Sequence, residues 1–222
     1  MKKFTSLVIA GAALGVIASP ASAVIVLGTL TGGNYFDLGG SFVVTNAAAT
    51  PVVGVDAINK TNVYGLNERQ GVALTKETRF WTVDALTLES PEVDLGIGTK
   101  VASHLIFIDP AEVPDPAIAS GTVTFSGKIL GYRWSHAQLD GTTALLGAKN
   151  ITYGDLMQLE TANDEISFSG NTLTYNLLSK ASSGDFLRVI TTVPEPTSWL
   201  MLVTGFSLVG FAARRRQRAV AA

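Results

Sequence analysis

Apolar and polar residues alternate along much of this 222-residue chain with the two-residue period of a β-strand. The run that starts at Gly121 places Val123, Phe125 and Ile129 on one side of an extended segment, with threonine, serine and lysine on the other. Residues 171–177 repeat the pattern with two leucines and a tyrosine facing inward, and Ser-Gly-Asn before them predicts a hairpin turn. Both runs are expected to be half-buried strands.

Further short strands are indicated by β-branched and aromatic residues between glycine-rich turns. Their expected ranges are 24–30, 41–45, 79–88, 101–108, 166–168 and 186–191. Helical periodicity is confined to two short candidates, residues 135–146 and 153–159. Many short strands with little helix predict an all-β fold, an antiparallel β-sandwich or jelly-roll-like domain in which one face of each sheet is packed and the other is solvated.

The first 23 residues have the three parts of a secretory signal peptide. Lys2 and Lys3 form the basic start, residues 7–18 are apolar, and Ala21 and Ala23 give the small-x-small pattern that signal peptidase accepts. An N-terminal membrane anchor is the alternative, but about a dozen apolar residues are few for a span. We therefore predict cleavage after Ala23.

The C-terminus combines a proline motif, an apolar run and a basic cluster. Pro194, Glu195 and Pro196 fix an extended backbone, and residues 199–213 are apolar. As a helix this run rises about 22 Å, short but workable against a hydrocarbon core of about 30 Å. The arginines that follow predict a cytoplasmic membrane stop at 214–218. They are Arg214, Arg215, Arg216 and Arg218.

These features divide the chain into a signal peptide at 1–23, an exported domain at 24–192 and a tail at 193–222, whose motif is 193–196 and whose transmembrane helix is 199–213. Of 16 Lys and Arg residues, six lie in the two ends, so the exported domain has ten bases against seventeen acids and a net charge near −7. An acidic domain argues against nucleic acid as a partner. The absence of cysteine excludes disulfides and thiol chemistry.

Few residues suggest catalysis. Neither His104 nor His136 has a second histidine at metal-binding spacing, and His104 shares the parity of its apolar neighbours, so it is expected to be a hydrogen-bonded strand histidine. The chain has no nucleophile elbow, Walker loop or dinucleotide-binding glycine motif. We therefore expect no enzyme, no catalytic residues, no metal and no cofactor, although carboxylate pairs for glycoside cleavage have no spacing that would select or exclude them.

Two weaker candidates for binding remain. Asp109, Glu112 and Asp115 lie in a proline-stiffened loop and offer oxygen ligands for Ca²⁺, but a solvated loop needs the same residues and the EF-hand pattern is absent, so calcium binding stays open. Tyr132 and Trp134 share one strand face and are a speculative glycan-binding pair, with Arg133 or His136 bonding to sugar hydroxyls. Core packing of these two rings is favoured, because large aromatic side chains more often fill cores.

Together, the signal peptide, the cysteine-free domain, Pro194-Glu195-Pro196, the short apolar helix and the terminal arginines resemble the PEP-CTERM proteins of Gram-negative bacteria. The resemblance covers about the last thirty residues. It implies that an exosortase, an integral membrane cysteine transpeptidase, recognises and cuts the tail in a setting of exopolysaccharide and biofilm production. A sortase signal would need Leu-Pro-x-Thr-Gly, and a GPI signal would end apolar, so neither fits.

The resemblance assigns no activity to residues 24–192. We favour a non-catalytic structural or adhesive role for an exported protein, first anchored in the membrane through its C-terminal helix and then placed at the cell surface or in the extracellular matrix. Its partners would be signal peptidase, exosortase and exopolysaccharide. The alternatives are a carbohydrate-binding module and, less favoured, a polysaccharide-modifying enzyme.

Overall fold

The computed structural model describes residues 22–82, 92–110, 115–160, 162–180, 183–194 and 205–206. The chain divides into two compact units, one spanning Ala21–Pro194 and the other made of Met1–Pro20 and Glu195–Ala222. Residues 1–21 of the expected signal peptide and almost all of the expected transmembrane segment lie outside the described residues, although Gly205 and Phe206 are helical. Within the described residues, no helix is long and apolar enough to cross a membrane.

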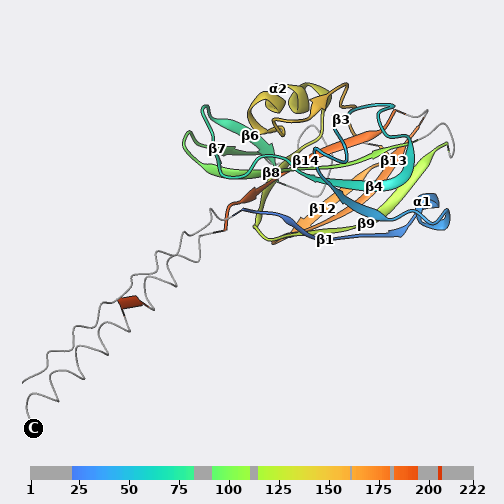
Figure 1. The fold of residues 1–222 in the computed structure, drawn as a ribbon, viewed down its shortest axis with the longest axis horizontal. Coiled ribbons are helices and arrows are strands. Elements are labelled where there is room, and N and C mark those ends of the chain that lie inside the picture. Colours follow the sequence, from blue (N-terminus) through green and yellow to red (C-terminus); the bar gives the residue numbers. More distant parts are fainter. Residues whose placement is uncertain are drawn as a thin grey trace, which may run out of the picture. The chain divides into compact units, whose positions relative to one another are not determined.

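A four-stranded antiparallel sheet forms one layer of the domain (Figure 1). Its strands, in spatial order, are β1 (Ile25–Gly32), β9 (Ala117–Phe125), β13 (Thr172–Ser179) and β12 (Glu165–Ser169). In β9 every second residue is buried, which is the alternation that the sequence predicts for this strand. The predicted hairpin is confirmed: Ser169 pairs with Thr172, and Gly170 lies between them at a φ of 62°.

An eight-stranded sheet forms the second layer, and its pairs are antiparallel except for β2 with β4. Its strands, in spatial order, are β2 (Phe42–Thr45), β4 (Lys60–Asn67), β8 (Lys100–Asp109), β14 (Asp185–Thr192), β10 (Ile129–Arg133), β6 (Thr78–Trp81) and β7 (Glu92–Leu95), with β5 (Val72–Ala73) also paired to β8. A small parallel pair joins β3 (Val52–Val53) and β11 (Thr152–Tyr153). The helices are α1 (Asn34–Asp37) and α2 (His136–Leu146).

The two sheets share one buried cluster, in which Ile106 of β8 and Leu187 of β14 join Val123 of β9 and Leu173 of β13. The opposite face of the eight-stranded sheet is also covered, because Phe107 packs with residues of α2 and nearby loops (Figure 1). The all-β class is therefore confirmed. The expectation of one solvated face per sheet is wrong for β8, which is buried at every position after Lys100, and for most of β14.

The strand that begins before Gly121 is shorter than the alternation predicts. It ends at Phe125, and Ile129 instead opens β10 in the other sheet. Between them the chain passes so close to the last strand that a Cβ at Gly127 would lie 2.0 Å from the Thr192 carbonyl oxygen. Ile129 nevertheless reaches the same buried cluster as Phe125, which is why the pattern looked continuous.

The helix expected at 135–146 is confirmed as α2, but the one expected at 153–159 is wrong. Tyr153 ends β11, and the residues after it bond to distant segments instead of to their own next turn. The carbonyl of Leu156 accepts from His136 Nδ1 at 3.0 Å, and Leu159 N donates to the Trp134 carbonyl at 3.3 Å. Both leucines are fully buried, so an extended path places both in the core. The sequence analysis also missed β4.

Candidate functional site

One turn of the domain touches both of its ends. The amide of Val24 donates to Ser126 Oγ at 2.9 Å, and the amide of Lys128 donates to Thr192 Oγ1 at 2.9 Å. Val24 is the residue that would follow the predicted signal cleavage, and Thr192 ends β14. Residues near both ends of the domain therefore bond to the same turn, residues 126–128.

The proline motif follows β14 without a linker. Thr192, Val193 and Pro194 are partly buried. Glu195, Pro196 and the four terminal arginines lie outside the described residues. Since β14 is hydrogen-bonded to β8 on one side and β10 on the other, the tail is attached to an interior strand of the sheet. Ala23 is fully buried in the domain, so cleavage after it is expected to precede folding.

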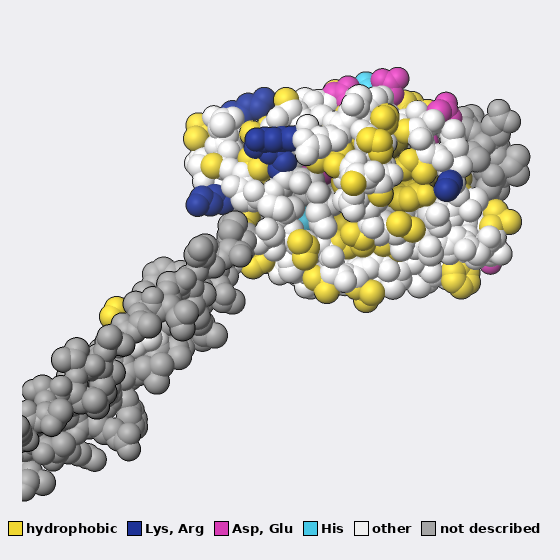
Figure 2. Space-filling view, viewed as in Figure 1, with side chains coloured by type: hydrophobic (Ala, Val, Ile, Leu, Met, Phe, Trp, Pro, Cys, Tyr) yellow, Lys and Arg dark blue, Asp and Glu magenta, His cyan; other side chains and the backbone are white. Residues whose placement is uncertain are grey.

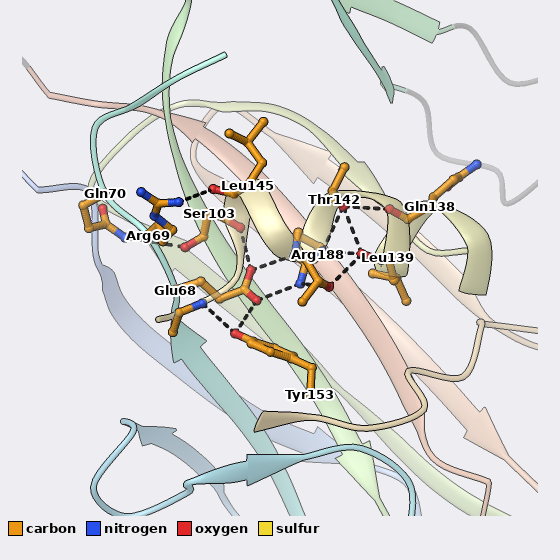
Figure 3. A network of polar contacts seen from close by, with 12 residues as sticks. Glu68, Arg69, Gln70, Ser103, Gln138, Leu139, Thr142, Leu145, Tyr153 and Arg188 are labelled. Atoms are coloured by element: carbon orange, nitrogen blue, oxygen red, sulfur yellow. Dashed lines mark hydrogen bonds and ion pairs between the residues drawn. The ribbon is translucent and has the colours of Figure 1, made fainter. Parts of the chain in front are cut away.

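A buried ion pair occupies the middle of β14 (Figure 3). Arg188 and the side chain of Glu68 are both fully inaccessible, and two guanidinium nitrogens each donate to one carboxylate oxygen at 2.8 Å. The other guanidinium N–H groups donate to the Leu139 carbonyl at 2.7 Å and to the hydroxyls of Thr142 and Thr143 at 2.8 and 3.1 Å. Arg188 thus fixes α2 on the sheet.

Glu68 is satisfied as completely as its partner. Ser103 Oγ donates to one carboxylate oxygen at 2.6 Å, and the Tyr153 hydroxyl donates to the other at 2.8 Å. The pKa of Tyr153 is raised first by burial and then by the charge of Glu68. Burial lowers the pKa of Arg188, but the charge of Glu68 and its hydrogen bond raise this pKa above its usual value. No donor or acceptor of this network is left for substrate, and its arrangement is structural.

An open pocket of about 350 Å³ adjoins the network. Its described lining residues are amides, aliphatic side chains, Glu68, Arg69 and Lys149, with no serine, threonine, histidine or tyrosine among them. The single carboxylate is held by Arg188, and Arg69 donates to the Leu145 carbonyl at 2.9 Å. The carboxylate of Glu68 and the guanidinium of Arg69 in this pocket are therefore both committed to contacts within the fold.

His104 is a hydrogen-bonded strand histidine, as predicted. It is fully buried, with Nδ1 2.8 Å from Asn67 Oδ1 and Nε2 3.1 Å from Thr191 Oγ1. The Asn67 oxygen also accepts from the Ile25 amide at 2.9 Å, so Nδ1 of His104 carries the proton. Burial lowers the pKa of His104 to about 3. The histidine links β1, β4, β8 and β14 and is unavailable for catalysis or metal binding.

Tyr132 and Trp134 lie in the core, where the favoured alternative placed them. They are 0% and 4% exposed, and Trp134 packs edge-on against Trp81 with ring centroids 6.5 Å apart. The neighbouring Arg133 lies over the Phe80 ring. The speculative glycan platform is therefore corrected, because a sugar cannot stack on rings that are covered by the protein.

Of the possible calcium ligands after β8, Asp109 has another role in the structure. Asp109 is fully buried, and its carboxylate accepts backbone N–H groups of Asp56, Ile58 and Asn59. It closes the loop between β3 and β4. Glu112 lies outside the described residues, and Asp115 is exposed.

Three other carboxylates come together at the start of β14. Oxygen atoms of Glu160, Asp164 and Asp185 all lie within 4.8 Å of one another. Sequence reasoning missed this group because Asp185 is far from the other two along the chain. It also missed Arg188 and Glu68, although a lone arginine within the apolar run Phe-Leu-Arg-Val-Ile is a usable signal for a buried ion pair.

Replacing Arg188 tests the central ion pair. Arg188→Met leaves Glu68 buried without a counter-charge and is expected to lower the free energy of unfolding by about 3–5 kcal/mol, measured by urea titration. The double variant Glu68→Gln/Arg188→Met should lose less than the two single changes added together. Arg79→Met is the control, because Arg79 pairs with Glu92 and Asp94 on the surface and should matter little. Equal effects of the two arginine changes would contradict the assignment.

The lowered pKa of His104 predicts that the free energy of unfolding decreases in acid. In the unfolded chain it protonates below about pH 6.5, whereas the folded protein keeps it neutral down to about pH 3, so the stabilisation present above pH 6.5 is lost as pH falls. His104→Gln removes this titration. Between pH 7 and pH 5 the parent should lose about 2 kcal/mol more than the variant in urea unfolding. Parallel losses would show that His104 is protonated in the folded state.

Comparison with known proteins identifies the tail. A model of the PEP-CTERM protein-sorting motif matches residues 192–216. No curated protein and no solved structure shows significant similarity to the chain. The match begins on the last residue of β14 and covers the proline motif, the apolar run and three of the four arginines. The chain therefore carries a PEP-CTERM sorting signal, which indicates an exported precursor sorted by exosortase.

Proposed function

We propose that this protein is a non-catalytic structural or adhesive component of the cell surface or extracellular matrix. The observation that carries the proposal is the PEP-CTERM motif at 192–216, which starts at the end of an interior strand. A pull on the tail acts on β14, which is hydrogen-bonded to β8 on one edge and to β10 on the other, so both neighbouring strands resist it. Such an attachment suits a domain that is held on a surface.

In the proposed sequence of events, signal peptidase first removes residues 1–23, and the apolar segment at 199–213 then holds the precursor in the membrane. Exosortase next cuts at or near Pro194-Glu195-Pro196 and releases or re-anchors the domain. The two-layer packing of the sheets supports the β-sandwich expectation for the exported part. Pro194, the first residue of the motif, is also the last residue of the domain and is partly buried.

The described surface offers a contact face for an adhesive role. Figure 2 shows hydrophobic side chains gathered among polar ones on the visible face. Among the described residues, apolar side chains that are 50–62% exposed lie on β1, on or directly after α1, and on β2, which are neighbouring elements. They are Val26, Leu27, Phe36, Leu38 and Val44. A carbohydrate-binding module built on Tyr132 and Trp134 has no support, because both rings are buried. The pocket residues likewise give no support to a polysaccharide-modifying enzyme.

The processing step is tested by intact mass of the protein from whole cells and culture fluid. In the parent strain we expect a species that begins at Val24 and has lost the C-terminal segment. In an exosortase-deletion strain, and in the variant Pro194→Ala/Pro196→Ala, the tail should remain. Pro51→Ala, at an exposed proline of the domain, is the control and should be processed normally. Retention of the tail in the parent, or its loss in the deletion strain, would contradict exosortase processing.

A further inference from the structure

The carboxylates of Glu160, Asp164 and Asp185 form a group of negative charges without a positive partner. Their oxygen atoms lie within 4.8 Å of one another. In the described part of the chain, the ion pairs join Arg79, His136 and Arg188 to other acids, and none reaches this group. Three like charges at this spacing repel one another strongly unless a cation or protons compensate them.

Asp185 gives the independent sign of a missing ligand. Its side chain is fully buried, and no N–H group or hydroxyl of a described residue donates to either of its carboxylate oxygens, which lie beside the carboxyl group of Glu160. Glu160 Oε2 is also buried without a partner. Leaving an ionised carboxylate buried and unsatisfied is among the costliest arrangements in a protein. Burial, and then the charges of Asp164 and Glu160, raises the pKa of Asp185 to about 9.

Asp164 holds the loop that supplies two of the three acids. One of its carboxylate oxygens accepts the Leu178 amide at 2.6 Å, and the other accepts the amide of Glu160. The first bond fastens the loop to β13 of the four-stranded sheet, whereas Asp185 is the first residue of β14 in the eight-stranded sheet. The three carboxylates therefore bridge the two sheets on a prearranged loop.

We propose that Glu160, Asp164 and Asp185 bind a Ca²⁺ ion that ties the two sheets together at the start of β14. Carboxylate oxygens are the ligands that Ca²⁺ prefers. With contacts of 2.3–2.6 Å, oxygens that lie within 4.8 Å of one another are close enough to share one ion. No histidine or cysteine belongs to the group, which disfavours zinc and copper. Extracellular Ca²⁺ modules work at about 10⁻⁴–10⁻³ M, a range suited to an exported protein.

The ion would act on the same strand that carries the sorting tail. Asp185 begins β14 and Thr192 ends it, so the cation fastens one end of the strand and the tail extends from the other. Binding to the folded state alone stabilises it by mass action. The site does not depend on the tail, and its test therefore succeeds or fails separately from processing.

The test uses the full chain, purified in detergent micelles and stripped of divalent cations with EGTA. Addition of 10 mM CaCl₂ should raise the melting temperature by about 3–10 °C. Sodium chloride at the same ionic strength should not. Isothermal titration calorimetry should give one Ca²⁺ per chain. Absence of a Ca²⁺-dependent shift in the parent would overturn the proposal and leave protons as the compensating charge.

Asp185→Asn separates binding from folding. Without Ca²⁺ this variant should melt at the same temperature as the parent or higher, because asparagine keeps the shape of the side chain and carries no charge. Ca²⁺ should then have no effect on it. Glu165→Gln is the matched control, an exposed acid next to Asp164, and should respond to Ca²⁺ like the parent. An equal Ca²⁺ shift in Asp185→Asn would overturn the assignment of the ligands.

Discussion

The position of β14 is constrained by the buried guanidinium of Arg188. A charge in the interior is tolerated only when its hydrogen bonds are complete, and here Glu68, the Leu139 carbonyl and two threonine hydroxyls supply them. Glu68 lies directly after β4, and the other acceptors lie in α2. Arg188 reaches all of them only in the observed register of β14. Sliding β14 by one residue would turn Arg188 toward the four-stranded sheet, so the ion pair fixes the register as well as the helix position.

The other polar groups of the interior depend on that register. Thr191 reaches His104, and through Asn67 this network includes the first strand of the domain. Asp185 faces Glu160 and Asp164 at the opposite end of β14, and Thr192 meets Lys128 where the sorting motif begins. Stability, the proposed cation site and attachment of the tail are therefore properties of one strand. A load applied through the C-terminal tail would enter a strand that is hydrogen-bonded on both edges.

The sequence predicted what local patterns encode. Alternation in β9 and β13, the glycine at 170 and the helix at 136–146 all follow from nearest neighbours, and the sorting tail follows from a contiguous motif. Long-range contacts were not predicted, because no local sequence pattern pairs Arg188 with Glu68 or brings Asp185 to the 160–164 loop. The helix expected at 153–159 was wrong for the same reason. Leu156 and Leu159 have a helical spacing, but an extended segment places both in the core. The aromatic residues at 132 and 134 show that parity identifies a shared face and leaves open which side of the sheet it covers.

Hydrogen exchange of the native protein, followed amide by amide, tests the central position of β14 most directly. If β14 is fixed on both edges by β8 and β10 and internally by Arg188, its amides should open only with the global unfolding free energy. Edge strands such as β12 and β7 should open at lower free energies. A lower free energy of opening for the amides of β14 than for those of β12 would contradict the account. The strand that carries the tail would then be among the first to separate from the sheet.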